Sequence, residues 1–164
     1  MQGTDNATIV RRFYSELWST GKLDGIEGLI ASDFVDRVNP SIRGIAGVKQ
    51  LITGFRTAFP DLVFTVDELI SQEDAVVARF TSTGTHRGVL AASTGIEALQ
   101  GVQGVPPTGK HVKLTSIGIH HLTAGKIKDA YVVSDPLQML RQLGVAPMTA
   151  PAAVGETASH PSTM

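Results

Sequence analysis

The chain contains no cysteine among its 164 residues. This absence excludes disulfide bonds, catalysis by a thiolate and zinc sites built from cysteine, and it fits a reducing compartment. The sequence also lacks an apolar run that approaches the ~18 residues needed to cross a bilayer. Its N-terminus, MQGTDNATIVRRFY, lacks the charged-then-apolar pattern of a secretory signal. We therefore expect a cytoplasmic protein without a membrane partner.

The chain also has little excess of either charge. Its formal net charge is −1, which gives no electrostatic reason to expect nucleic acid as a partner. Charged residues make up 18% of the chain and apolar residues 42%, a globular composition. The length suits a single domain with its own hydrophobic core.

Apolar residues at helical spacing fill the N-terminal third of the chain. They predict helices over about 5–20, 23–30 and 44–60, with a short extended segment over 33–40. The first helix can be capped by Asp5 or Asn6, and the third is stopped by Pro60.

Alternating patterns typical of strands follow. We expect strands over 62–70, 75–86, 111–122 and 127–134, with a hairpin turn at 71–74. A last helix runs over 136–144, with proline at its first position and Gly144 just beyond its end. Helices and strands segregated in this way predict an α+β fold: a curved antiparallel sheet packed against three N-terminal helices, with a short C-terminal helix. Such a cone would enclose a cavity suited to a small apolar ligand.

Two segments depart from this pattern. Residues 89–104 are small and carry little charge, which predicts an inserted loop with one helical turn at 96–99. Residues 146–164 are rich in Ala, Pro, Ser and Thr, and we expect a disordered tail there. The folded domain is therefore predicted over residues 1–145.

Five segments in this order carry a resemblance to a known family: GVKQLITGFRTAFPDL, GTHRG, PPTGK, GIHHLTAGKI and DPLQMLRQLG. They resemble the SnoaL-like polyketide cyclases, within the superfamily of nuclear transport factor 2 and ketosteroid isomerase. The similarity extends over roughly residues 6–144. It implies a cone with a pocket at its open end, a homodimer or higher homo-oligomer, and acid–base chemistry without a cofactor. It also implies that an aspartate on the last strand, with a histidine nearby, promotes aldol closure of a polyketide ring.

The chain differs from that family at two places. Arg37 stands where members often carry histidine, which replaces a possible acid–base group with a permanent cation. The segment 89–104 looks longer than the usual link, and it is either a lid or a surface insertion. We favour the insertion, because long loops cost little stability.

The hairpin around Ala124 and Gly125 decides which side chains face the cavity. A two-residue turn needs positive φ at both residues, which alanine disfavours, whereas a three-residue loop needs it at Gly125 alone. We therefore expect the second register, which pairs Leu122 with Lys126. Its more apolar face would look into the cavity and carry the odd-numbered residues Ile117, Ile119, His121, Ile127, Asp129, Tyr131, Val133 and Asp135. His120 would then face outwards.

Asp135 and His121 are the predicted catalytic residues. A carboxyl in an apolar pocket can remove a proton next to a carbonyl or protonate a forming alkoxide, and His121 could orient it. Asp135 also precedes Pro136, so it could simply cap the last helix, and the two roles are compatible. His121 could equally be a hydrogen-bonded core histidine.

Further residues are predicted to bind the substrate: Tyr14, Trp18, Arg37, Phe55, Phe59, His86, Asp129, Tyr131 and Met139. The tyrosines could donate hydrogen bonds to an oxyanion, although the helix aromatics would also suit a core. Asp129 could instead pair with Lys128 or Arg37, and a structural hydrogen bond is the leading interpretation of His86.

The predicted substrate is a polyketide or similar small hydrophobic metabolite. No cofactor is expected, since the five histidines show no metal-binding spacing. Two alternatives remain open: epoxide opening by an acid pair formed by Asp129 and Asp135, and a module that binds a small ligand without catalysis.

Overall fold

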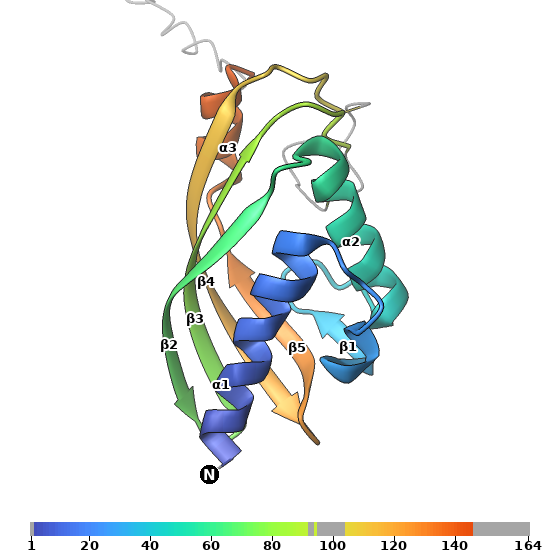
Figure 1. Ribbon diagram of the computed structural model, residues 1–164, viewed down its shortest axis with the longest axis vertical. Coiled ribbons are helices and arrows are strands. Elements are labelled where there is room, and N and C mark those ends of the chain that lie inside the picture. The colour runs from blue at the N-terminus through green and yellow to red at the C-terminus, as the bar shows by residue number, and fades with distance from the viewer. Residues whose placement is uncertain (1, 92–93, 95–103, 146–164) are drawn as a thin grey trace, which may run out of the picture.

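The computed structural model of the protein describes residues 2–91, 94 and 104–145. Its five strands form a curved sheet in the order β1-β5-β4-β3-β2 (Figure 1). The strands are β1 (Ile30–Asp36), β2 (Val63–Gln72), β3 (Ala75–Thr85), β4 (His111–Thr123) and β5 (Lys126–Val133). The predicted α+β fold, with a curved sheet and a short C-terminal helix, is confirmed.

The sheet is mixed and not purely antiparallel, which corrects the prediction. β1 runs parallel to β5 at the edge of the sheet, whereas the other neighbouring strands are antiparallel. A parallel pair requires a long crossover, and the chain between β1 and β5 supplies one. The extended segment expected over 33–40 overlaps the end of β1, which begins earlier, at Ile30, and ends at Asp36.

The helices are α1 (Gln2–Arg12), the π-helix η1 (Phe13–Trp18), the 3₁₀ turn η2 (Ile26–Gly28), α2 (Gly44–Ala58) and α3 (Pro136–Leu143). α1 begins at Gln2, so neither Asp5 nor Asn6 is its cap. The predicted helix over 23–30 is only the turn η2, because strand β1 already begins at Ile30. α2 and α3 lie where the sequence predicts them.

The first helix continues into a π-helix, η1. The Ser19 N–H reaches back to the Tyr14 carbonyl, five residues earlier, which gives the wide turn of a π-helix. The buried side chains of this turn are Phe13, Tyr14, Leu17 and Trp18. Residues at these spacings share one face in an α-helix as well, so the four side chains face the core as the helical spacing predicts.

α1 crosses one face of the sheet and contacts β2, β3 and β5, while α2 packs on β1 (Figure 1). α3 packs against β4 at the end of the sheet farthest from the N-terminus (Figure 1). The core fills the space between the helices and this inner face of the sheet. Among the described residues, no helix is long and apolar enough to cross a membrane.

The register predicted for the last hairpin is wrong. Ala124 and Gly125 form a two-residue turn, with φ of 49° and 72°, so Thr123 pairs with Lys126 and Leu122 with Ile127. A bulge follows, after which His121 pairs with Asp129 and His120 with Ala130. The inner face of β4 therefore carries the even-numbered residues, and His120 is 0% exposed.

Packing at the ends and the middle of β4 explains this outcome. Val112, Leu114 and Leu122 are even-numbered and buried, so the strand gains apolar burial at both ends. At its centre, a Cβ on Gly118 would lie 2.7 Å from His120 Cε1 and 3.2 Å from the Tyr14 hydroxyl. Glycine thus leaves room on the inner face for the paired rings of Tyr14 and His120.

The two ends of the predicted insertion pair with each other. Leu90 and Val105 form an isolated bridge with two backbone hydrogen bonds of 2.9 Å, and both are buried. Thr94 is also buried. The helical turn predicted at 96–99 and the tail predicted over 146–164 lie outside the described residues.

Candidate functional site

A cavity of about 480 Å³ lies between η1, α2 and the inner face of the sheet. Nine aromatic residues line it: Phe13, Tyr14, Trp18, Phe34, Phe55, Phe59, Phe64, Phe80 and Tyr131. Their rings contact one another, with the Tyr14 ring 4.3 Å from Phe80 and the Trp18 ring 4.9 Å from Phe64. The walls therefore suit a flat apolar ligand.

The structure brings six of the predicted substrate-binding residues to this cavity: Tyr14, Trp18, Phe55, Phe59, Tyr131 and Met139. Tyr131 only borders it, because its side chain is 49% exposed and pairs with Ile119 on the outer face of the sheet. The indole N–H of Trp18 is buried and has no acceptor among the described residues. Trp18 therefore offers the cavity its ring surface, while its N–H is buried behind that surface.

A buried hydrogen-bonded pair lies on the inner face of the sheet behind this wall. The His120 Nδ1 is 3.3 Å from the Val76 carbonyl oxygen, so Nδ1 carries the proton and donates. The His120 Nε2 is 2.9 Å from the Tyr14 hydroxyl and accepts a hydrogen bond from it. Burial, above all, lowers the pKa of His120 to about 4, so the ring is neutral near pH 7.

This pair changes the role available to Tyr14. Burial, and then the negative charge of Asp36, raise the pKa of Tyr14 well above its ordinary value. The Tyr14 proton is committed to His120, so its oxygen can accept from a ligand but does not donate to an oxyanion. The predicted oxyanion role of Tyr14 is therefore wrong for this arrangement.

Asp36 is the carboxylate among the described residues that line the cavity. It is the last residue of β1 and half-buried. Its Oδ1 accepts the backbone N–H groups of Val38 and Asn39 at 2.9 and 2.8 Å. Asp36 is not among the site residues predicted from the sequence, although strand alternation offered a signal: Asp36 shares a face with Phe34 and opposes Arg37.

Arg37, His121 and Asp129 form a separate cluster on the outer face of the sheet. The Asp129 Oδ1 is 2.7 Å from the His121 Nδ1, and its Oδ2 accepts from Arg37 at 2.8 Å. Burial alone would raise the pKa of Asp129, but the hydrogen bonds from Arg37 and His121 outweigh it and lower that pKa. The prediction that His121 and Asp129 face the cavity is wrong, because the bulge in β5 turns Asp129 outwards beside His121.

Asp135 lies beside the cavity but caps a helix. Its Oδ1 accepts the Gln138 N–H at 2.8 Å, which is the N-cap interaction predicted for α3. Its neighbours Ser134 and Pro136 line the cavity, whereas the exposed Asp135 does not. The predicted pair of Asp135 and His121 is thus not assembled inside the cavity.

His86 has a structural role and lies apart from the cavity lining. It is 0% exposed, and its Nδ1 accepts the Thr108 N–H at 3.2 Å. Its backbone exchanges hydrogen bonds of 2.8 Å with Lys110 and Gly109. Its ring lies 5.2 Å from that of Phe59. His86 therefore fixes the segment before β4 to the end of β3.

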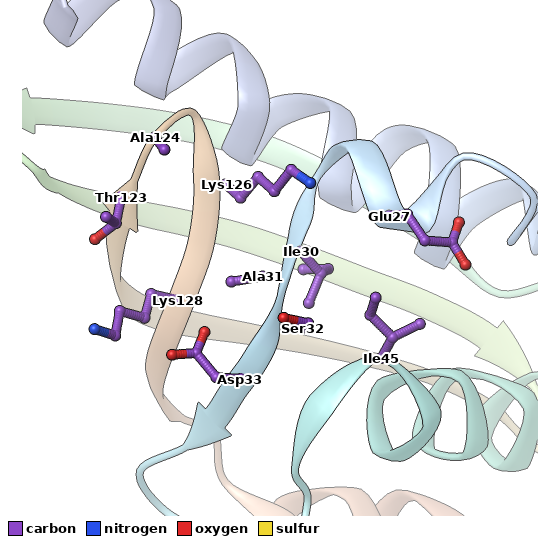
Figure 2. A pocket seen from close by; sticks show the side chains of 10 residues that line it. All are labelled: Glu27, Ile30, Ala31, Ser32, Asp33, Ile45, Thr123, Ala124, Lys126 and Lys128. Atoms are coloured by element: carbon purple, nitrogen blue, oxygen red, sulfur yellow. The ribbon is translucent and has the colours of Figure 1, made fainter.

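A second depression, of about 460 Å³, lies beside the tip of the β4–β5 hairpin (Figure 2). Its charged lining residues are Glu27, Asp33, Lys126 and Lys128. Figure 2 shows these four side chains around the depression: Glu27 comes from η2, Asp33 from β1, and Lys126 and Lys128 from β5. Within the described residues, it shares no lining residue with the aromatic cavity. Its mixed charge makes it a poor site for the apolar ligand that the aromatic cavity suits.

Comparison with known families gives a match over most of the chain. Residues 8–143 match the family model described as SnoaL-like polyketide cyclase. A search of curated proteins finds no match.

Solved structures share the fold. One from Bacillus cereus ATCC 10987, provisionally named a polyketide cyclase, is 27% identical and has a TM-score of 0.70. The match covers 88% of this chain and 83% of that one. IdmH from Streptomyces antibioticus, provisionally a polyketide cyclase, is 25% identical, with a TM-score of 0.67 and coverage of 85% and 99%. AclR from Streptomyces galilaeus, provisionally a hydroxylase, is 24% identical, with a TM-score of 0.69 and coverage of 91% and 87%. At this identity AclR is similar in fold alone, and a fold does not by itself fix a reaction.

Proposed function

Because the chain belongs to the SnoaL-like polyketide cyclase family, we propose that it is an enzyme that closes a ring in a polyketide or similar small hydrophobic metabolite. The reaction is an intramolecular aldol addition that uses general acid–base catalysis and no cofactor. The observation that carries this proposal is the aromatic cavity of about 480 Å³. Its volume lies within the range of about 300–1,000 Å³ of small-molecule sites.

The lining of the cavity supports a neutral, flat substrate. Aromatic rings supply stacking surfaces, and the described lining residues include no lysine, arginine or histidine. Burial against such walls is worth about 25 cal/mol for each Å² of apolar ligand surface. Binding would therefore depend on shape and apolar contact, with few polar contacts to set the orientation.

An aldol closure needs a base that removes a proton next to one carbonyl and an acid that protonates the new alkoxide. Asp135 remains a candidate for proton transfer at the rim, since both of its chain neighbours line the cavity. The acid pair suggested for epoxide opening is not supported, because Asp129 lies on the outer face of the sheet with His121 and Arg37.

The cavity can be tested by filling it. Val112 lines the cavity and is buried, so Val112→Trp should exclude a flat ligand, whereas Val63→Trp on the exposed side of β2 should not. Binding of a hydroxyanthraquinone ester can be followed through fluorescence of Trp18, the natural tryptophan, and in the variants by calorimetry. We expect at least tenfold weaker binding for Val112→Trp alone. Equal affinity of the two variants would place the ligand elsewhere.

Turnover separates the enzyme from a binding module. The wild-type protein should convert a linear aryl polyketone ester into a cyclised product, detected by mass spectrometry and by the absorbance of the new ring. Tight binding without conversion of any ester in a panel of chain lengths would contradict the cyclase and favour the binding module.

We also propose that two copies of the chain associate through the outer face of the sheet. Ile70, Val77, Ile119 and Tyr131 are cross-strand neighbours in one row from β2 to β5. Ile70 is 59% exposed and Ile119 38%. A continuous apolar row of this kind is unusual on a monomer.

Charged groups border this row on both sides, as polar groups border an interface core. Arg79 pairs with Asp67 and Glu68 at one border, and the Arg37–Asp129–His121 cluster lies at the other. Sedimentation velocity should detect a dimer that Ile119→Glu converts to monomers, while the exposed Val145→Glu leaves it intact. A monomeric wild-type protein would contradict this assembly.

A further inference from the structure

We propose that Asp36 is the general base of the cavity, and that it removes a proton from the carbon next to a carbonyl of a neutral substrate such as a ketone ester. This inference rests on the proposed function, because it assumes that the cavity binds the reacting molecule. Asp36 is not among the residues that the sequence analysis selected, and it is identified by its contacts alone.

The first observation is how Asp36 is held. Its backbone N–H donates to the Ile42 carbonyl at 3.1 Å, which ties the end of β1 to the start of α2. Its Oδ1 accepts two backbone N–H groups, from Val38 and Asn39. Both donors are backbone groups, so they hold the Asp36 Oδ1 in place without depending on a flexible side chain of another residue. A base held in this way loses little orientation freedom when it reacts.

The second observation is the other oxygen. Within residues 2–91, 94 and 104–145, no donor lies within hydrogen-bonding distance of Asp36 Oδ2. Asp36 lines the cavity, so Oδ2 is the oxygen left to meet a ligand. Its charge also reaches the aromatic wall, since it is a cause, after burial, of the raised pKa of Tyr14.

The remaining acid–base groups nearby are already engaged. His120 uses Nδ1 towards Val76 and Nε2 towards Tyr14. Asp129 is bound by His121 and Arg37 on the outer face. Arg37 also follows Asp36 directly and points the opposite way, so it does not neutralise the Asp36 carboxylate. Asp36 therefore differs from these groups: its carboxylate lines the cavity, and only one of its two oxygens has a donor among the described residues.

The same charge limits the substrate. An anionic carboxylate beside Asp36 would be repelled, and no lysine or arginine among the described lining residues would compensate it. The reacting end should therefore be neutral, as in an ester, an amide or a ketone. A free acid of the same skeleton should bind more weakly.

The chemical step balances within the substrate. Oδ2 takes the proton of the C–H bond next to a carbonyl, and the bonding pair forms an enolate. The enolate carbon attacks a second carbonyl carbon of the same molecule, so a C–C bond forms and the C=O pair moves onto oxygen. The alkoxide then takes the proton back from the Asp36 carboxylic acid. No oxidant, reductant or other reactant is consumed, and the product is an isomer of the substrate.

Asp36→Asn tests this step because the amide oxygen still accepts from Val38 and Asn39 but no longer accepts a proton. Asp33→Asn is the matched control, since Asp33 is an exposed residue of the same strand that lies outside the aromatic cavity. The first probe is an aryl methyl ketone that cannot cyclise. Its binding is read from Trp18 fluorescence, and its proton–deuterium exchange next to the carbonyl is read by NMR.

We expect wild type and Asp33→Asn to accelerate exchange, and Asp36→Asn to lose at least 100-fold of that rate while binding the ketone within threefold of wild type. The methyl ester of a keto acid should also bind at least tenfold more tightly than the free acid in wild type, with that preference reduced in Asp36→Asn. Exchange that persists in Asp36→Asn, or is absent in a wild-type protein that binds the ketone, overturns the assignment of Asp36.

Ring closure is measured separately with the linear polyketone ester. Exchange that depends on Asp36, together with no cyclised product from any ester, would refute the proposed cyclisation and leave Asp36 as the base of another reaction. Cyclisation that survives Asp36→Asn with an unchanged rate would refute Asp36 and leave the cyclase intact. The two failures therefore give different results.

Discussion

Protonation of His120 should destabilise the folded protein, and replacement by glutamine should remove that effect. His120 is fully buried, with both ring nitrogens hydrogen-bonded to Val76 and Tyr14. Burial lowers its pKa from an ordinary 6.5 to about 4. Glutamine can keep one donor and one acceptor at this position but does not titrate. The substitution therefore removes the titration of residue 120 while it keeps most of the packing and hydrogen bonding of the side chain.

The sign follows from proton uptake in the two states. Below pH ~6.5 the unfolded chain binds a proton at His120, whereas the folded protein binds it only near pH ~4, so stability falls as the pH is lowered through this window. The full effect of the 2.5-unit difference is about 3 kcal/mol at ~1.4 kcal/mol for each unit. About 2 kcal/mol of this should already be lost between pH ~7.5 and pH ~5.

Urea unfolding at several pH values measures this loss. The free energy of unfolding of wild type minus that of His120→Gln should decrease by about 2 kcal/mol between pH ~7.5 and ~5. The constant cost of the substitution cancels, as do the contributions of other titrating groups such as His86. An equal pH dependence of the two proteins, or an NMR titration of His120 near pH ~6.5, would refute the burial of a neutral His120 ring.

Three further changes have expected outcomes. Ala124→Asn should stabilise the protein by about 0.5–1 kcal/mol in thermal unfolding, since asparagine tolerates positive φ better than alanine does; a lower melting temperature would contradict the two-residue turn. Asp135→Ala should cost about 1 kcal/mol and Asp135→Asn much less, through the cap alone; unaltered turnover in Asp135→Asn would exclude Asp135 as a catalytic group. Arg37→Met should raise the pKa of Asp129, as read in a carboxyl NMR titration. The ionised Asp129 stabilises the folded protein at pH values above its unfolded pKa, and this contribution, which is lost as the pH falls, should be smaller in the variant. An unchanged pKa would show that His121 alone keeps the pKa of Asp129 low.

Elements defined by local signals could be predicted from the sequence. The apolar stripe of α2 and the stop at Pro60 locate a helix without knowledge of its neighbours. The same holds for α3, where Asp135 caps the first turn and Gly144 adopts a positive φ of 75° after the last one. These signals act within one or two turns, and here several of them agree, whereas the apolar side predicted over 23–30 stood alone and gave way to strand β1.

Elements that depend on distant partners could not be predicted. β1 was expected only as an extended segment, because its parallel pairing with β5 joins residues almost 100 positions apart, as for Ile30 and Ile127. The π-helix at Phe13–Trp18 was also not predicted, since its apolar spacing fits an α-helix equally well. Asp36 was missed because alternation along β1 places it on the same face as Phe34 but does not show that this face borders a cavity, which depends on where β1 lies in the sheet.

The reversed hairpin has a different cause, and it bears on the proposed assembly. The prediction assumed that the more apolar face of a strand is the buried one, and on β4 that face carries Ile117 and Ile119. The structure buries the opposite face and leaves Ile117 50% and Ile119 38% exposed, beside Tyr131. The rule fails when both faces of a strand are covered, as in a sheet with a helix layer on one side and a second subunit on the other. The apolar composition of the outer face, which misdirected the register, therefore supports the association of two copies through it.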